Sequence, residues 1–349
     1  MFQTLEIDKV PNDQVVNLLT NNRIGTPGKS MVYEHRNVLK KIQELTQPYF
    51  VNLTIRNNLF GTVCFSKRHF IVQGKSKPAF YIRYFSFIEN FRSNSNVGIN
   101  KKRKNSLIKK DIFRLLEGEG FEEDTPIIFY AYVDSENIRS SRLIHEFGFS
   151  TTGTLSSIIF SRIFPKADKN VLKAEKGDFP DILKALKDYY NDFQFVTFDD
   201  LFKNNDYYLI KVNDQIVAGA QANHEEWYIV DIPGFKGWIL KNLIPGIPFI
   251  NRLFKPEFKF ISFNAIYCKD GYERELQNLF SCLLSKFKVH TALMSMDQNS
   301  KLYNQVKKLN LGLTHTIQGE TQSSIVIKST DKSYNQKHLP FYISAFDIM

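Results

Sequence analysis

The sequence predicts an α/β protein in which helices flank a mixed sheet, and in which one β-β-β-α-β-α unit occurs twice. Three observations support this: each half has a hairpin pattern, a long apolar strand pattern follows each hairpin, and an amphipathic helix and a further strand follow each of these. The 349 residues are enough for two domains of ordinary size. The repeated order of elements therefore indicates an internal duplication.

The hairpins are the first repeated element. In the first half, residues 51–55 and 59–65 are rich in strand-forming residues and flank a short polar turn. In the second half, residues 207–212 and 215–222 have the same arrangement. We therefore expect each unit to open with two antiparallel strands.

A long strand and a helix follow each hairpin. Aromatic and β-branched residues predominate in residues 80–88 and 258–266, which predicts strands. Apolar residues then recur at helical spacing in residues 107–116 and 276–284. Each unit is expected to pack one such helix against its sheet.

A second strand and a short helix close each unit. Strand patterns at 127–133 and 291–296 each lead to an Asp and an Asn, after which a short helix is expected. Gly148 and Gly312 stand where these helices should end, a position that favours a residue with left-handed backbone. The tail, residues 339–349, alternates enough to predict a closing strand.

A polar stretch at 164–169 predicts the boundary between two domains. We expect residues 1–165 to form an N-terminal domain that binds a cofactor, and residues 166–349 to form a degenerate copy. The second copy carries an insertion, residues 231–257, rich in Pro, Gly and aromatic residues. This insertion is too apolar for a free linker and is expected to pack on the rest of the chain.

Composition narrows the functional classes. Lys and Arg number 46 against 36 Asp and Glu, and the net charge of +10 favours an anionic partner. No run of about 18 apolar residues is present, and no secretory signal is visible at the N-terminus, so we expect a cytoplasmic protein without integral membrane association. Cys64, Cys268 and Cys282 have no metal-binding spacing and are expected to be buried thiols, and no metal is expected. Motifs of nucleotide hydrolysis, serine hydrolysis and zinc proteolysis are absent.

The segment from Phe129 to Phe149, FYAYVDSENIRSSRLIHEFGF, resembles the GNAT (GCN5-related) N-acyltransferase superfamily. Members typically have a strand, an Asn, a helix that begins with small residues, and an aromatic-Lys-x-Gly-Phe ending. The order of elements extends the resemblance over residues 51–162, whereas the second half matches in element order only. The resemblance implies two tandem GNAT-like acyl-CoA N-acyltransferase domains, distantly like the hookless-type acetyltransferases of plants. The residues that match the pattern are Asn137, Ser140, Ser141, Leu143, Gly148 and Phe149.

The resemblance also implies an acyl-CoA co-substrate, with acetyl-CoA as the first choice, held where two neighbouring strands separate. The family's glycine-rich phosphate loop falls either on residues 103–108, where Ser106 and Ile108 replace the glycines, or on residues 92–98, where Gly98 survives. A side chain at those glycine positions crowds the approach of a phosphate. The expected cofactor contacts are Phe87, Ile88, Arg103, Lys104, Asn105, Ser106, Leu107, Asn137 and Ser141.

The charge pattern supports this placement independently. Four basic residues, 101–104, precede the middle helix of the first half, where the helix dipole disfavours cations unless an anion is bound. A pyrophosphate would be such an anion; a solvated basic loop and a nucleic-acid contact are the alternatives. In the second half, residues 269–274 combine one glycine with mixed charge and would hold an anion poorly. We therefore expect the first half to bind the cofactor and the second to supply pocket walls.

Acyl transfer to an amine requires a neutral amine, a donor for the carbonyl oxygen and an acid for the leaving thiolate. Backbone N–H groups at a bulge in strand 81–88 are expected to polarise the carbonyl. Glu89, just past this strand, is the candidate catalytic residue that accepts the proton of the amine; a surface carboxylate is the alternative. The tyrosine that serves as the acid in many members is replaced by Ile144.

Three functions remain open on the sequence alone. The leading hypothesis is an acyl-CoA-dependent N-acyltransferase that acts on an unidentified amine. A transferase that uses aminoacyl-tRNA is a second, because some proteins of that activity pair two such units and a positive chain suits RNA. A non-catalytic GNAT-fold binding protein is a third, favoured by Ile144 and Ser106.

Overall fold

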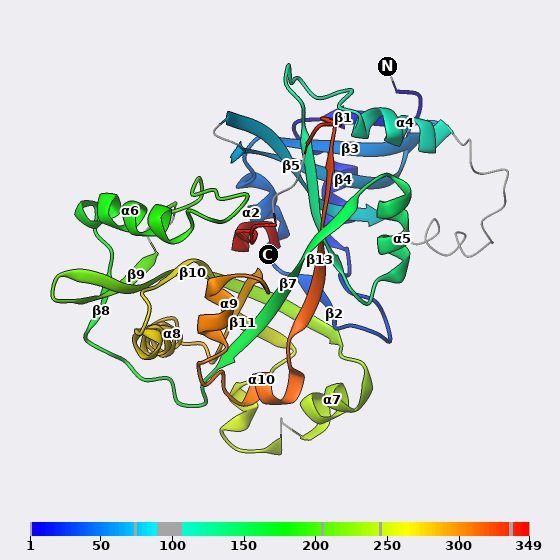
Figure 1. Cartoon of the computed structure of the whole chain (residues 1–349). Coiled ribbons are helices and arrows are strands. Elements are labelled where there is room, and N and C mark those ends of the chain that lie inside the picture. The colour runs from blue at the N-terminus through cyan, green and yellow to red at the C-terminus, as the bar shows by residue number, and fades with distance from the viewer. Residues whose placement is uncertain are drawn as a thin grey trace.

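The computed structural model describes residues 2–72, 75–88, 107–203, 206–243, 246–334 and 338–348. Twelve strands form a continuous sheet in the order β1-β3-β4-β5-β6-β13-β7-β12-β11-β10-β9-β8, and β2 joins β10 from outside this path (Figure 1). The order is nearly symmetric about its centre: elements of the first half lead inward from one edge, and their counterparts from the second half lead inward from the other. This symmetry confirms the predicted duplication.

The first half contains all of its predicted strands and helices. It begins with an arm of short elements that the sequence did not predict: β1 (Leu5–Asp8), α1 (Asp13–Thr20), β2 (Val32–His35) and α2 (Val38–Gln43). The unit itself follows as β3 (Pro48–Ile55), β4 (Asn58–Val72), β5 (Lys75–Phe87), α4 (Leu107–Leu116), β6 (Ile128–Asp134), α5 (Ile138–Glu146) and β7 (Ser150–Ser161).

The second half repeats this order. Its elements are β8 (Val171–Lys173), α6 (Phe179–Tyr189), β9 (Tyr207–Val212), β10 (Gln215–Asp231), α7 (Gly234–Trp238), β11 (Glu257–Cys268), α8 (Glu273–Lys286), β12 (Thr291–Asp297), α9 (Lys301–Val306), α10 (Leu313–Gln318), β13 (Thr321–Ser329) and α11 (Ala345–Ile348). In Figure 1, α4 and α5 lie beside the first half of the sheet, and α6 and α8 lie beside the second.

The two halves exchange a strand at the centre of the sheet. β6 of the first half pairs along its whole length with β13 from near the end of the chain. β12 of the second half pairs with β7 from the first half. β7 and β13 also pair with each other, so strands of the two halves alternate there. Hydrogen bonds of the sheet therefore connect residues on both sides of the predicted boundary near residue 165.

The prediction of a strand at the end of the chain is wrong. The tail, residues 339–349, is not a strand: Phe341 makes a single bridge to Gln194, and the chain then forms α11. The reason is that Phe341 directs its N–H to the carboxylate of Asp297, at 2.9 Å, instead of joining the ladder. The closing strand is β13, whose position the sequence did not predict.

The glycines at the helix ends differ. Gly148 has φ of 85° directly after α5, as expected of a helix end. Gly312 also has left-handed backbone, with φ of 91°, but it begins α10 rather than ending α9. Its prediction as a cap of the preceding helix is therefore wrong, because the five residues 307–311 separate it from that helix.

The remaining predictions about burial are confirmed. Cys64, Cys268 and Cys282 are free and buried. The insertion packs on β10 and β11 through Leu240 and Phe254.

No helix in the described ranges is both long and apolar enough to cross a membrane. The same ranges contain no group of three or more His, Cys, Asp or Glu side chains placed to hold a metal ion.

Candidate functional site

In the first half, β5 separates from its parallel neighbour β6 part-way along its length. The parallel pairing runs from Ala79 opposite Ile128 to Tyr81 opposite Tyr130. Just past this point β5 bulges: its register with β4 shifts, and Tyr84 has φ of 56°, which is rare for a residue other than glycine. The bulge that the sequence predicted in strand 81–88 is therefore present.

The second half repeats both features. β11 pairs in parallel with β12 only at Ile261 and Ser262, and then separates from it. A register shift against β10 accompanies a left-handed residue, Ala265, with φ of 46°. The duplicated chain therefore contains two equivalent gaps between parallel strands, each beside a strained bulge.

The second gap is filled by the chain's own side chains. Tyr190 donates from its hydroxyl to the carbonyl of Ile266 at 2.6 Å, and Tyr342 donates to the side chain of Asn264 at 3.3 Å. Residues 341–343 of the tail line the same space, which keeps a cavity of only about 10 Å³. Such a volume accommodates about one water molecule, so a cofactor arm does not fit there.

The elements beside the first gap carry apolar side chains that are only half-buried. Ile82 and Phe87 of β5, Ile108 of α4 and Leu143 of α5 each pack against the apolar core of the first half, yet none of them is fully buried. Helix α5 has no buried residue, whereas its counterpart α9 has three; helix α4 has three, and its counterpart α8 has six. Half-buried apolar surface on both sides of separated strands is suited to an apolar ligand.

The two central helices also differ in charge at their first turns. The described part of α4 begins with Leu107 and contains Lys109 and Lys110 but no acidic residue in its first turn. Helix α8 begins with Glu273 and Glu275. Because anions are favoured at helix N-termini, the two glutamates occupy the place of an anion in the second half. This arrangement agrees with the expectation that the second half would hold an anion poorly.

Five of the predicted site residues lie in the described part of the chain, on β5, α4 and α5 or next to them. Phe87 ends β5, and Ile88 follows it and donates its N–H to the carbonyl of Phe60 at 3.1 Å. Leu107 lies at the first described position of α4 with 54% of its side chain exposed. Asn137 caps α5 by accepting the N–H of Ser140 at 3.0 Å, and Ser141 lies one turn further along this helix.

Asn137 therefore has a structural task that explains its presence without a ligand. The other predicted site residues, Glu89, Arg103, Lys104, Asn105 and Ser106, lie outside the described residues. The alternative loop at 92–98 lies outside them as well. Ile144, which replaces the usual acid, packs half-buried in the core of the first half.

The opposite face of the first gap is covered by the N-terminal arm. His35 of β2 and Tyr84 of the bulge line a common small cavity together with Lys41. Lys41 forms a nearly buried ion pair with Glu225 of β10, and its Nζ lies 3.5 Å from Nδ1 of His35. Burial lowers the pKa of His35 well below its ordinary value, and the positive charges of Lys41 and Arg83 act in the same direction. His35 is therefore neutral near pH 7.

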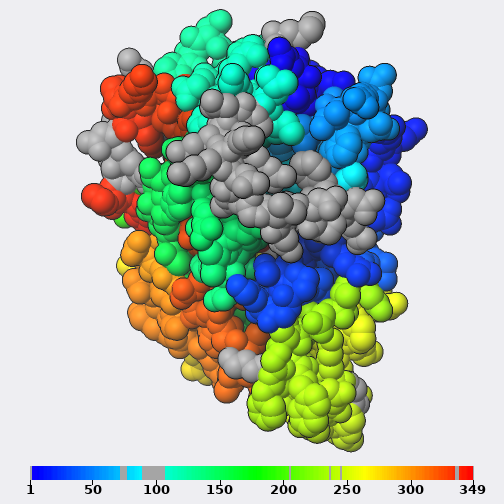
Figure 2. Space-filling model, turned by 90° about the vertical axis from the view of Figure 1, so that its right-hand side faces the viewer, coloured from blue at the N-terminus to red at the C-terminus, as the bar shows by residue number. Residues whose placement is uncertain are grey.

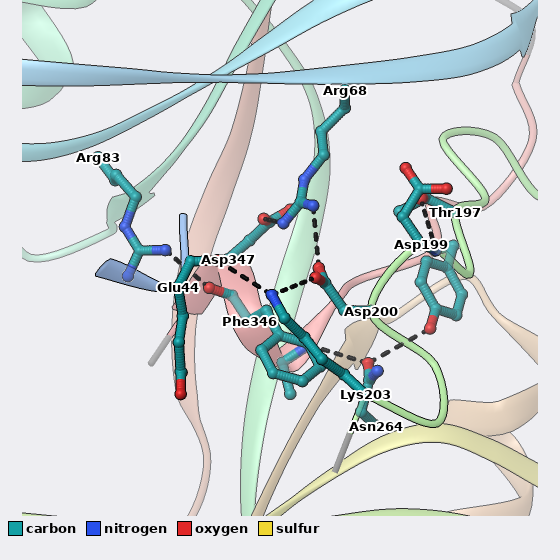
Figure 3. Close-up of polar contacts among 12 residues, drawn as sticks. Glu44, Arg68, Arg83, Thr197, Asp199, Asp200, Lys203, Asn264, Phe346 and Asp347 are labelled. Atoms are coloured by element: carbon teal, nitrogen blue, oxygen red, sulfur yellow. Dashed lines mark hydrogen bonds and ion pairs between the residues drawn. The ribbon is translucent and has the colours of Figure 1, made fainter. Parts of the chain in front are cut away.

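The C-terminal tail covers the same face, held by the buried Arg68 and the half-buried Arg83 (Figure 3). Arg83 of β5 donates to the carbonyl of Phe346 at 2.8 Å. Arg68 of β4 bridges Asp200 at 2.9 Å and Asp347 at 3.2 Å. Burial opposes the charge of Arg68, but the two carboxylates outweigh it and raise the pKa of the guanidinium. The tail is thereby fixed beside the bulge at the junction of both halves.

Sequence reasoning missed this polar layer. His35, Lys41 and Arg83 match no motif, and Lys41 lies 184 positions from Glu225 along the chain. The only signal in the sequence is a charged residue within an otherwise apolar strand pattern: Arg83 stands among Tyr81, Ile82 and Tyr84.

No family model matches the sequence, and a search of curated proteins gives no match. The solved structures do include similar folds. N-myristoyltransferase of Saccharomyces cerevisiae with bound myristoyl-CoA aligns with a TM-score of 0.55 at 10% identity, over 94% of this chain and 83% of that chain.

A second structure of the yeast enzyme, with bound myristoyl-CoA and inhibitors, aligns with a TM-score of 0.58 at 11% identity, over 99% of this chain and 84% of that chain. At these identities the likeness concerns the fold. The chain therefore has the fold of these structures over nearly its whole length. The repeated order of elements within it is the tandem arrangement that the sequence predicted.

Proposed function

We propose that this protein is an acyl-CoA-dependent N-acyltransferase whose first half holds the acyl-CoA. The observation that supports this best is a difference between the two halves: Tyr190 and Tyr342 fill the second gap, while apolar side chains of β5, α4 and α5 in the first half are only half-buried. The fold shared with an enzyme solved with bound myristoyl-CoA supports the same assignment. The basic residues 101–104 and Lys110 would face the pyrophosphate from the start of α4.

The resemblance favoured acetyl-CoA as the co-substrate. The half-buried apolar side chains of Ile82, Phe87, Ile108 and Leu143 favour a longer acyl chain, because each methylene of the ligand that they bury would contribute about 0.8 kcal/mol. We therefore propose a chain longer than acetyl. The amine would approach from the opposite face, beside the N-terminal arm and the tail.

Groups of the chain itself would carry out the acyl transfer. Backbone N–H groups at the Tyr84 bulge would donate to the thioester carbonyl oxygen as negative charge develops on it. The amine would attack the carbonyl carbon, the C–S bond would break, and the thiolate of CoA would leave and take up a proton. Glu89 would accept the proton of the amine, directly or through water. A base with this role should give an ascending limb in the pH–rate profile.

Titration calorimetry with CoA, acetyl-CoA and myristoyl-CoA tests the proposal. We expect binding of all three, with myristoyl-CoA the tightest, and at least about a tenfold loss in affinity after Arg103→Glu with Lys104→Glu. The matched control reverses two exposed lysines of α6, Lys184→Glu with Lys187→Glu, and should bind as the wild type does. If no CoA compound binds, the non-catalytic alternative replaces the proposal.

A further inference from the structure

The insertion exposes an unusual concentration of large apolar side chains. We call residues 231–257 the lobe; it forms the yellow-green protrusion at the lower right of Figure 2. Of fourteen large apolar side chains that are exposed in the described residues, five lie within residues 235–249. They are Phe235, Trp238, Leu243, Ile247 and Phe249.

These side chains are not left over from incomplete packing of the lobe. The inner side of the lobe has its own apolar residues: Leu240 and Phe254 pack against the sheet, and Leu253 is buried as well. The outer residues are additional: Phe235 and Trp238 stack on each other at 6.0 Å, with 74% and 51% of their surfaces exposed. Two apolar sides on one small element imply a second surface that covers the outer one.

The backbone holds one outer residue in place at a cost. Phe249 has φ of 66°, a left-handed conformation that is unfavourable for an aromatic residue, and 54% of its surface is exposed. Its ring lies 5.6 Å from that of Phe164, which is also exposed, and the guanidinium of Arg252 lies over both rings. A strained residue that presents an apolar ring to solvent indicates a surface under functional constraint.

The charges of the lobe point to the nature of the covering surface. Its sequence contains four basic residues, at 236, 241, 252 and 255, against two acidic ones, and Asp231 is paired with Lys241. Aromatic side chains interspersed with basic ones are typical of segments that insert into the interface of an anionic bilayer. Lysine is depleted in protein–protein interfaces, which makes a protein partner the poorer match.

We propose that the outer side of the lobe docks on an anionic membrane surface, with Phe235, Trp238 and Phe249 in the interfacial region and Arg252 and Lys255 at the lipid headgroups. The inference does not depend on the proposed acyltransferase function. Attraction of each basic residue to acidic lipids contributes in addition to the buried apolar area. Docking of this kind is reversible and depends on the ionic strength.

Flotation of the full chain with lipid vesicles tests the proposal. We expect binding to phosphatidylcholine vesicles that contain roughly one third phosphatidylserine, and weaker binding to pure phosphatidylcholine. Phe235→Ser with Trp238→Ser should weaken binding at least about tenfold. The matched control, Val10→Ser with Leu172→Ser, removes two apolar side chains that are exposed by 78% and 47% elsewhere and should bind as the wild type does.

The circular dichroism and thermal midpoint of both variants should match the wild type, since all four side chains are exposed. Three outcomes would overturn the proposal: no wild-type binding to the acidic vesicles, equal binding of the lobe variant, or equal binding to neutral vesicles. A dimer in sedimentation that the lobe variant abolishes, without vesicle binding, would assign the surface to a second copy of the chain instead.

Discussion

At the scale of single residues, the arginine of β4 connects three parts of the chain. Arg68 is 5% exposed and contacts Asp200 of the second half and Asp347 of the tail, and Tyr130 also donates to Asp347 at 3.0 Å. One guanidinium can pair with both buried carboxylates because its planar group presents several N–H donors in fixed directions. Burying these groups is favourable only while all of them remain paired.

Arg68→Met should lower the free energy of unfolding by about 3–5 kcal/mol, because it leaves Asp347 buried without a cation and leaves Asp200 with Lys203 alone. Chemical denaturation measures the change. Lys40→Met is the matched control: Lys40 is 71% exposed in its pair with Glu44, and its loss should cost less than about 0.5 kcal/mol. An effect of Arg68→Met below about 1 kcal/mol would mean that the cluster does not hold the tail.

His35 should make stability depend on pH. Its pKa is lowered in the folded protein by burial and by Lys41 and Arg83, while Glu225 faces Lys41 from β10. The unfolded chain therefore takes up this proton first, near the ordinary pKa of about 6.5, so the stabilisation is complete above that pH and is lost as the pH falls toward the folded pKa. The slope is at most about 1.4 kcal/mol per pH unit.

Denaturation between about pH 7.5 and 5.5 tests this point. His35→Gln should flatten the fall in stability, whereas the same change at the exposed His69 should leave the slope of the wild type. An unchanged slope in His35→Gln would show that folding does not change the pKa of this histidine.

At the scale of elements, the duplicated gaps evolved in different directions within one chain. Helix α8 buries six residues against its sheet, and tail residues close the neighbouring gap. Helix α4 buries three residues, and α4 and α5 keep Ile108, Leu143 and Ile144 half-buried. The same fold thus provides one unit built for packing and one that leaves apolar surface available for a ligand.

Leu143→Asn should distinguish an acyl-chain contact from a purely structural one. We expect the affinity for myristoyl-CoA to fall about tenfold while the affinity for CoA stays the same, because only the acyl chain loses apolar contact. Calorimetry with both ligands measures the difference. An equal fall for the two ligands would place Leu143 away from the acyl chain.

The sequence predicted the elements that depend on local pattern. The apolar alternation of β3 and β4, the helical stripes of α4 and α8, and the left-handed Gly148 are all encoded within short segments. It did not predict β13 as a partner of β6, because nothing local specifies a strand partner about 190 positions away. The sequence predicted a strand for the tail because apolar residues recur in it. Those residues are apolar because they fill the second gap, where they are buried.

The candidate site was predictable in part for the same reason. The bulge region and the residues of α5 followed from the resemblance, which covers contiguous sequence. His35 and Glu225 come together only through the pairing of β2 with β10, and short polar strands such as β2 carry little pattern.

At the scale of the whole molecule, strand exchange makes the two halves interdependent. Without residues after 165, β6 would lose the partner along its full length, β13, and β7 would lose β12. Unpaired buried backbone groups are costly, and the exposed edges would favour aggregation. The duplication therefore behaves as one cooperative unit.

Expression of residues 1–165 and 166–349 as separate chains tests this interdependence. We expect neither half to give a cooperative thermal transition alone, and the two to form a folded complex when they are produced together. Circular dichroism and co-purification measure the outcome. A cooperative transition in residues 1–165 alone would mean that the exchanged strand is dispensable.

The central claim is that the gap between β5 and β6 holds the acyl-CoA. A crystal structure of the full chain with a non-hydrolysable thioether analogue of myristoyl-CoA tests it most directly. We expect the acyl chain to lie against Ile82, Phe87 and Leu143, with the pyrophosphate at the start of α4. An analogue bound between β11 and β12, or away from both gaps, would contradict it.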